Sequence, residues 1–150
     1  MAANNDPIYS KVGALGTPLA ITAANTSSQG GGTIGTDIFN IFIADATNGS
    51  FVREVRMSAT ASVAATATTA TVARIFLSTQ STGTTTSSNT HLIAELALAS
   101  QTADQTTSAT YPVIYPLNIP VPPGYSILVT NHAAPAANTA WKVMAVGGNY

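Results

Sequence analysis

The chain has 150 residues, and 7% of them carry a charge, with 5 Lys or Arg against 6 Asp or Glu; an ordinary soluble domain has about 25%. A net charge of −1 with five scattered basic residues leaves no basic surface that could neutralise a row of phosphates, so we expect no nucleic-acid partner. The chain contains no cysteine, which excludes disulfides, thiolate metal sites and a cysteine nucleophile.

Two long stretches without charge, residues 57–73 and 105–141, invite a membrane interpretation. The first is made largely of Ala and Thr and the second is rich in Pro, so neither predicts a membrane helix. The N-terminal residues lack the basic and apolar regions of a signal peptide. A chain of this length holds one core, and we therefore expect a single domain with no membrane partner.

The first 16 residues predict an extended arm. Residues 1–16 mix Asn, Gly, Pro and Ala with isolated apolar residues at no regular spacing, and such a segment has too few apolar anchors to fold alone. We expect this arm to become ordered on a neighbouring subunit in an assembly. The domain proper is expected to cover residues 17–150.

Residues 17–150 predict an all-β fold, a β-sandwich of about eight strands, because short β-prone runs alternate with turn signals. The eight runs are 18–24, 38–44, 51–61, 69–78, 91–99, 113–119, 125–130 and 140–146. Asn48-Gly49 is a strong hairpin-turn dipeptide, and the polar run 79–90 predicts a solvent loop.

For three of these runs the sequence predicts further detail. Residues 91–99 contain Leu, Ala and Glu, which favour a helix, but the run is short and lacks a convincing cap, so we predict a strand. The run 113–119 carries Pro116, which cannot donate to a ladder, and this predicts an edge strand or a bulge. The run 51–61 alternates with period 2, which predicts a strand with one wet face. In that alternation Phe51, Arg53, Val55 and Met57 share one face, and Glu54 and Arg56 share the other.

No motif predicts catalysis or a cofactor. Residues 30–35 match G-x-G-x-x-G, but dinucleotide binding needs a helix directly behind the glycines, and the next run is strand-like. His91 and His132 have no short ligand spacing to a carboxylate, so we expect exposed loop histidines and no metal site. No G-x-S-x-G elbow is present and paired carboxylates are scarce. We expect no catalytic residues, no cofactor and no enzyme activity.

The densest charge cluster, Arg53, Glu54 and Arg56, is one candidate interface. Glu54 and Arg56 lie two residues apart on a predicted strand, so their side chains can pair. Two interpretations stay open: a solvated strand face, or an ion pair between subunits. Trp141 is the other interface candidate, and it and Phe51 are large apolar anchors for which a core position competes.

Six segments between residues 48 and 150 form a recognisable set: Asn48-Gly49-Ser50-Phe51-Val52-Arg53-Glu54-Val55-Arg56, Leu92-Ile93-Ala94-Glu95, Leu117-Asn118-Ile119, Pro122-Pro123-Gly124-Tyr125, Trp141-Lys142-Val143 and the terminal Gly147-Gly148-Asn149-Tyr150. Through these segments the chain, over about residues 48–150, resembles a group of small tailed-bacteriophage virion proteins of the head decoration or cement type. The resemblance implies a jelly-roll-like β-sandwich, a location on the outer surface of the capsid, and assembly as a trimer. It implies no reacting residues.

The sequence therefore predicts a structural protein of the phage virion that binds the major capsid protein lattice and stabilises the head. Low charge suits burial against copies of itself or a shell, because few ions lose water. Ala is the commonest residue and buries little area, so subunit contacts in a homo-oligomer are the expected supplement. The alternative is a tail-associated structural or glycan-binding module that uses Tyr111, Tyr115 and Tyr125.

Overall fold

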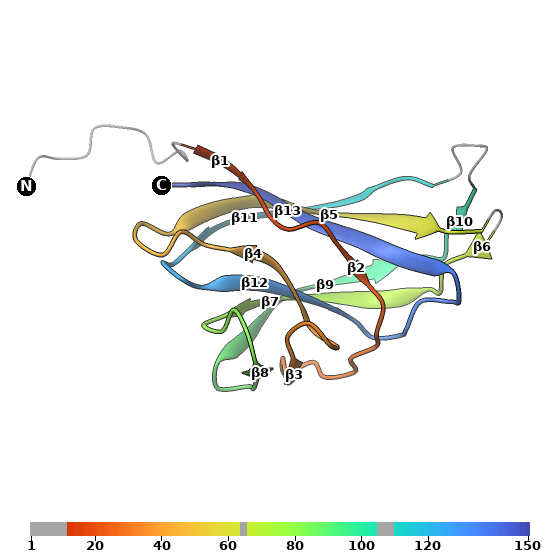
Figure 1. Ribbon diagram of the computed structural model, residues 1–150, viewed down its shortest axis with the longest axis horizontal. Coiled ribbons are helices and arrows are strands. Elements are labelled where there is room, and N and C mark those ends of the chain that lie inside the picture. Colours follow the sequence, from red (N-terminus) through yellow and green to blue (C-terminus); the bar gives the residue numbers. More distant parts are fainter. Residues whose placement is uncertain (1–11, 64–65, 105–109) are drawn as a thin grey trace, which may run out of the picture.

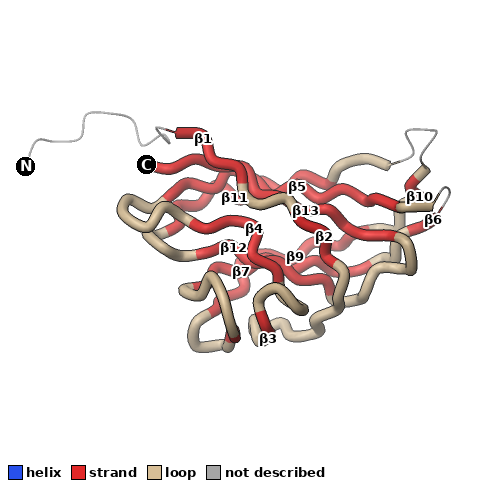
Figure 2. The backbone as a smooth tube through the Cα atoms, in the orientation of Figure 1, coloured by secondary structure: helices blue, strands red, loops and turns tan. Residues whose placement is uncertain are grey.

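A computed structural model describes residues 12–63, 66–104 and 110–150 of the chain, and these residues form thirteen strands and no helix (Figures 1 and 2). Every pairing between these strands is antiparallel. None of the described residues belongs to a helix long and apolar enough to cross a membrane.

Nine of the strands form two sheets. The first sheet contains, in spatial order, β1 (Val12–Leu15) and β2 (Leu19–Ile21), which both pair with β13 (Thr139–Asn149), then β5 (Ser50–Ala61) and β11 (Val113–Val121). The second sheet contains, in spatial order, β4 (Phe39–Ile43), β12 (Ser126–Asn131), β7 (Thr71–Ser78) and β9 (Thr90–Leu98). Two short ladders complete the fold: β3 (Gly32–Thr33) with β8 (Thr84–Thr85), and β6 (Thr66–Ala67) with β10 (Thr102–Ala103).

The two sheets pack face to face, and the main core lies between them (Figure 1). The first sheet contributes alternate residues of β5 and β13, among them Val55, Met57 and Trp141, and the second contributes residues such as Ile75 and Ile127. This alternation of inward apolar residues is what a sheet with one covered face requires. The predicted all-β sandwich is thereby confirmed.

All eight predicted runs contain a strand, including residues 91–99, which form β9 and not a helix. The run with the prolines forms β11 at an edge of the first sheet, with an irregular register between Pro116 and Ile119. The edge position and the irregular register both agree with the prediction, which was based on the missing N–H groups of proline.

The prediction of which β5 residues face inward is wrong for the first residues of the strand. The register of β13 against β5 shifts between Val146 and Gly147, opposite Glu54 and Val52, so Arg53 is an extra residue in the ladder. A bulge of this kind reverses the alternation on one side of it. Val52 is therefore buried in the core, whereas Phe51 and Arg53 leave the face on which Val55 lies.

The boundary of the predicted arm also differs from the structure. Residues 1–11 lie outside the described residues, but Val12–Leu15 form β1, paired in four consecutive positions with β13 of the same chain. This part of the predicted arm therefore belongs to the sandwich. Gly16 continues the contact, because its N–H donates to the carbonyl of Ala145 at 2.9 Å.

The outer face of the second sheet is covered by loop segments. Ile38, Phe76 and Leu128 form a second, smaller core cluster with Ile34 and Leu92 packed against it. Residues 30–35 belong to this cover and contain β3, and the next strand of a main sheet is β4, where dinucleotide binding would need a helix. The predicted solvent loop at 79–90 is wrong in part, because β8 lies within it and pairs with β3. All six residues of β12 are buried as a result.

Candidate functional site

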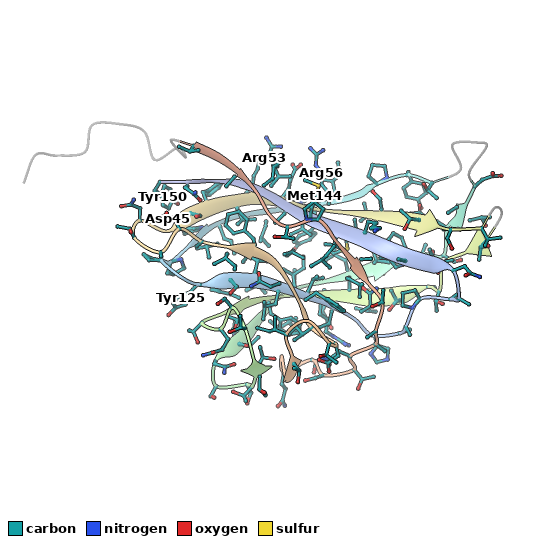
Figure 3. The ribbon with its side chains drawn as sticks, in the orientation of Figure 1. Asp45, Arg53, Arg56, Tyr125, Met144 and Tyr150 are labelled. Carbon is teal, nitrogen blue, oxygen red and sulfur yellow. The ribbon has the colours of Figure 1, made fainter. Side chains whose placement is uncertain are left out.

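The outer face of the first sheet carries the most distinctive set of exposed side chains. Strand register brings distant residues into rows across this face. One row is Ile114 of β11, Arg56 of β5 and Met144 of β13. The next row is Pro116, Glu54 and Val146, and Leu15 of β1 extends it. Figure 3 shows Arg53 and Arg56 projecting from the first sheet on the side away from the second.

Glu54 is held between two arginines on this face. Arg56 Nε lies 2.5 Å from one carboxylate oxygen of Glu54, and Arg53 Nε lies 3.2 Å from the other. The hydrogen bond from Arg56 is the main cause that lowers the pKa of Glu54, Arg53 adds to it, and desolvation opposes both. Glu54 is therefore ionised at neutral pH and orients both guanidinium groups. The predicted pairing of Glu54 with Arg56 is confirmed.

Arg53 joins this cluster because of the bulge in β5. Strict alternation would place Arg53 on the inner face with Val55, where an unpaired charge would be costly. The extra residue in the ladder turns its side chain outward. Sequence reasoning missed this placement, although the unfavourable burial of an arginine was a signal for it.

The face is positively charged although the whole chain is not. Lys142 lies on β13 opposite Ser58 of β5, in the outward-facing phase of that strand. Among the described residues of this face, three cations, Arg53, Arg56 and Lys142, therefore stand against one anion, Glu54, for a net charge of +2, whereas the whole chain has a net charge of −1. This asymmetry favours a partner surface of negative charge.

Apolar side chains surround the charges. Leu15 is 70% exposed and Ile114 is 49% exposed, and Met144 and Val146 lie partly exposed between them. An open groove runs beside Arg56 and Lys142 and is bordered by Pro18, Pro112 and Met144. Interfaces between proteins combine apolar contacts with arginine and methionine in this way, and exposed apolar patches on a soluble domain mark interaction surfaces.

Trp141, the remaining interface candidate, is not on this face. Its side chain is fully buried in the core between the sheets, on β13 opposite Ile21 and Ala59. The structure therefore assigns it to packing within one chain. Its Nε1 has no hydrogen-bond partner in the structure.

The three tyrosines proposed for glycan binding are not brought together. Tyr111 precedes β11 and Tyr125 follows it, and a nine-residue strand separates its ends by about 30 Å. Tyr115, within β11, packs against the core. A shared aromatic platform therefore cannot form from these three residues in one copy of the chain.

The two histidines lie apart and in different settings. His132 Nδ1 is 3.3 Å from Arg74 Nη1, and Arg74 Nε is paired with Glu95 at 2.7 Å. His91 lies exposed on β9 opposite Leu77. Within residues 12–63, 66–104 and 110–150, no group of three metal-ligating side chains comes close enough to hold an ion.

Comparisons of the chain with family models, with curated proteins and with solved structures found no match. The function is therefore argued from the sandwich and from the outer face of its first sheet.

Proposed function

We propose that this protein is a bacteriophage capsid decoration, or cement, protein that binds the major capsid protein lattice on the outer surface of the head. The observation that carries the proposal is the outer face of the first sheet, where Arg53, Glu54 and Arg56 stand among exposed apolar residues. A rigid sheet holds these side chains in a fixed pattern. Such a face suits docking onto a large ordered surface more than catalysis, which draws on several ionisable groups with perturbed pKa values.

The order of the strands supports a jelly-roll arrangement. If β1 and β2 are taken as one interrupted strand, the first main strand pairs with the last, β13, and β4 pairs with β12. Further in, β5 pairs with β11 and β7 pairs with β9. The chain is thus ordered as one long hairpin wrapped into two sheets, which is how a jelly roll is built, and capsid proteins use this fold widely.

The stabilising mechanism follows from mass action. A protein that binds the assembled lattice and not its dissociated subunits shifts the equilibrium toward the lattice. A ligand at 100 times its dissociation constant stabilises the state it binds by about 2.7 kcal/mol per site. Repetition of such sites over a shell makes a modest affinity sufficient to strengthen the head against internal pressure.

The proposal includes a homo-oligomer, with the trimer taken from the resemblance. The composition supports association, because many inward positions are occupied by alanine, such as Ala59, Ala73 and Ala145. Each alanine contributes little apolar area. Burial between copies would supplement this core without disulfides.

The location in the virion tests the proposal first. Phage heads and tails are separated and each fraction is analysed by mass spectrometry for this chain. We expect the chain in heads. Its recovery from tails alone would overturn the proposal and support a tail-associated module.

The docking face is tested by binding to purified heads that lack this protein. We expect Ile114→Glu to weaken co-sedimentation with heads at least tenfold, because the substitution places a charge in an apolar contact and an anion against a partner surface of negative charge. Ile43→Glu on β4 is the matched control, since Ile43 is similarly exposed, at 57%, on the other sheet. Equal loss of binding in both variants, or in neither, would contradict the assignment of this face.

A further inference from the structure

The two lateral sides of the sandwich differ in how their edge strands are protected. On one side lie β11 and β9. Strand β11 contains Pro116 and Pro120, which lack N–H groups, and an irregular register between them. Strand β9 exposes His91 and Glu95. Prolines, bulges and charges are the usual means by which an edge strand avoids pairing with another chain.

Strand β1 on the opposite side has none of these features. It pairs with β13, and no other described strand pairs with its second edge (Figure 1). Its sequence, Val12-Gly13-Ala14-Leu15, contains no charge and no proline. Val12 is 63% exposed and Leu15 is 70% exposed, and these are the two most exposed large apolar side chains of the described residues. An apolar, uncharged edge is a template for strand addition.

The backbone groups on the open side can be identified. Gly16 N–H donates to Ala145 on β13 at 2.9 Å, so position 16 faces β13. Hydrogen-bonding positions alternate along an antiparallel strand, and therefore Ala14 also faces β13. The N–H and C=O groups of Gly13 and Leu15 then point to the open edge. Among the described residues, these two donors and two acceptors have no strand partner, and they lie next to exposed apolar side chains.

We propose that the open edge of β1 pairs with a second copy of this chain, so that the first sheets of two subunits are joined by backbone hydrogen bonds. This proposal rests on the homo-oligomer of the proposed function and specifies its geometry. Two β1 edges pair about a two-fold axis, which gives a dimer in place of the trimer that the resemblance implies. A second copy fits because the edge has no charge, whereas the outer face, with a net charge of +2, would repel itself. Strand addition also uses the backbone groups, which a contact through side chains would leave unpaired.

Gly13 allows a matched test of these backbone groups. A Cβ atom added at Gly13 would meet no atom within 4 Å, so the side chain of Gly13→Ala fits within one chain. Gly13→Pro leaves the hydrogen bonds between β1 and β13 in place, because the N–H group of position 13 faces the open edge. Only Gly13→Pro removes the N–H group that points to the open edge. By sedimentation equilibrium at micromolar concentration, we expect the wild type and Gly13→Ala to be oligomers. Gly13→Pro should sediment at the mass of one chain, 15.2 kDa.

A second variant tests the same contact through a side chain, without changing any backbone hydrogen-bonding group. Val12→Lys should also give the mass of one chain, because the two-copy contact would bring lysines together. Val63→Lys is the control, since Val63 is also exposed but follows β5 at the far end of the first sheet, near the position where Ala61 pairs with Thr139. Thermal melts of all variants should agree within a few degrees once the oligomer has been dissociated by dilution.

Each outcome decides the proposal. A monomeric wild type, or an oligomer that persists in either Gly13→Pro or Val12→Lys, would overturn the pairing of β1 with a second copy. Dissociation by Gly13→Pro and Val12→Lys but not by their controls supports it. Head binding by Ile114→Glu is measured separately, so failure of the β1 edge can be distinguished from failure of the docking face.

Discussion

Substitution of threonine by valine should have opposite effects on stability at two buried positions. Thr130 on β12 is fully buried, and its hydroxyl has no hydrogen-bond partner. Thr68 is 2% exposed, and its hydroxyl donates to the carbonyl of Gln101 at 3.3 Å and accepts from the N–H of Gln101 at 3.0 Å. Threonine to valine replaces the hydroxyl by a methyl group of nearly the same shape. The difference between the two sites is therefore the hydrogen bonding alone.

The size of each change in unfolding free energy follows from the hydrogen-bond partners of the hydroxyl group. Thr130→Val removes a buried hydroxyl that has lost its water without compensation, which costs the folded state about 1–3 kcal/mol. We expect the free energy of unfolding to rise by about 1–3 kcal/mol. Thr68→Val leaves the N–H of Gln101 unpaired, while the carbonyl of Gln101 still accepts from the N–H of Thr68 at 2.9 Å. We expect a loss of about 1–3 kcal/mol.

Urea unfolding of both variants and the wild type, at one protein concentration, measures these changes. Unchanged slopes with denaturant would show that the unfolded states are comparable. Destabilisation by Thr130→Val as large as that by Thr68→Val would refute the reasoning, because it would mean that the Thr130 hydroxyl is hydrogen-bonded in solution.

Three further predictions concern the core, the charge cluster and a corner of the sandwich. Trp141→Ala should lower the free energy of unfolding by about 3–5 kcal/mol, measured by urea unfolding, because a fully buried indole leaves a cavity; a change below about 1 kcal/mol would place the side chain elsewhere. The lowered pKa of Glu54 means that its pairing stabilises the fold above its ordinary pKa of 4.5 and that this contribution is lost as the pH falls below that value. Glu54→Gln should therefore lower the melting temperature at pH 7 and lower it progressively less as the pH falls below 4.5, and an equal deficit at pH 7 and pH 3 would contradict a charge effect. Gly16→Ala should destabilise the fold, since an added Cβ would lie 1.8 Å from the carbonyl oxygen of Ile41, and a thermal melt equal to that of the wild type would disprove this close approach.

The sequence by itself determined the class of the fold and the place of its main strands. Period-2 alternation in residues 140–146 predicts that Trp141, Val143 and Ala145 share one face, and the side chains of all three are buried in the core. Local chemistry was also sufficient for a turn at Asn48-Gly49, where Gly49 has a φ of 77°, and at Pro116, which placed β11 at an edge. The predicted hairpin at Asn48-Gly49 is wrong, because the turn joins β4 and β5, which belong to different sheets and do not pair. In these cases the cause lies within a few residues, in backbone conformation or in a missing donor.

Only the tertiary structure decided the outer face of the first sheet. Leu15, Glu54, Pro116 and Val146 come from four strands that are distant in the sequence, and strand register places them in one row. The bulge at Arg53 reverses the alternation of side chains at the start of β5. Val52 therefore lies in the core, where strict alternation would have placed Phe51. Neither register nor bulge is encoded in a local pattern, because both depend on which partner strand lies alongside. The same holds for β1, whose four residues show no period of their own and are ordered by pairing with β13, a strand more than a hundred residues later in the chain.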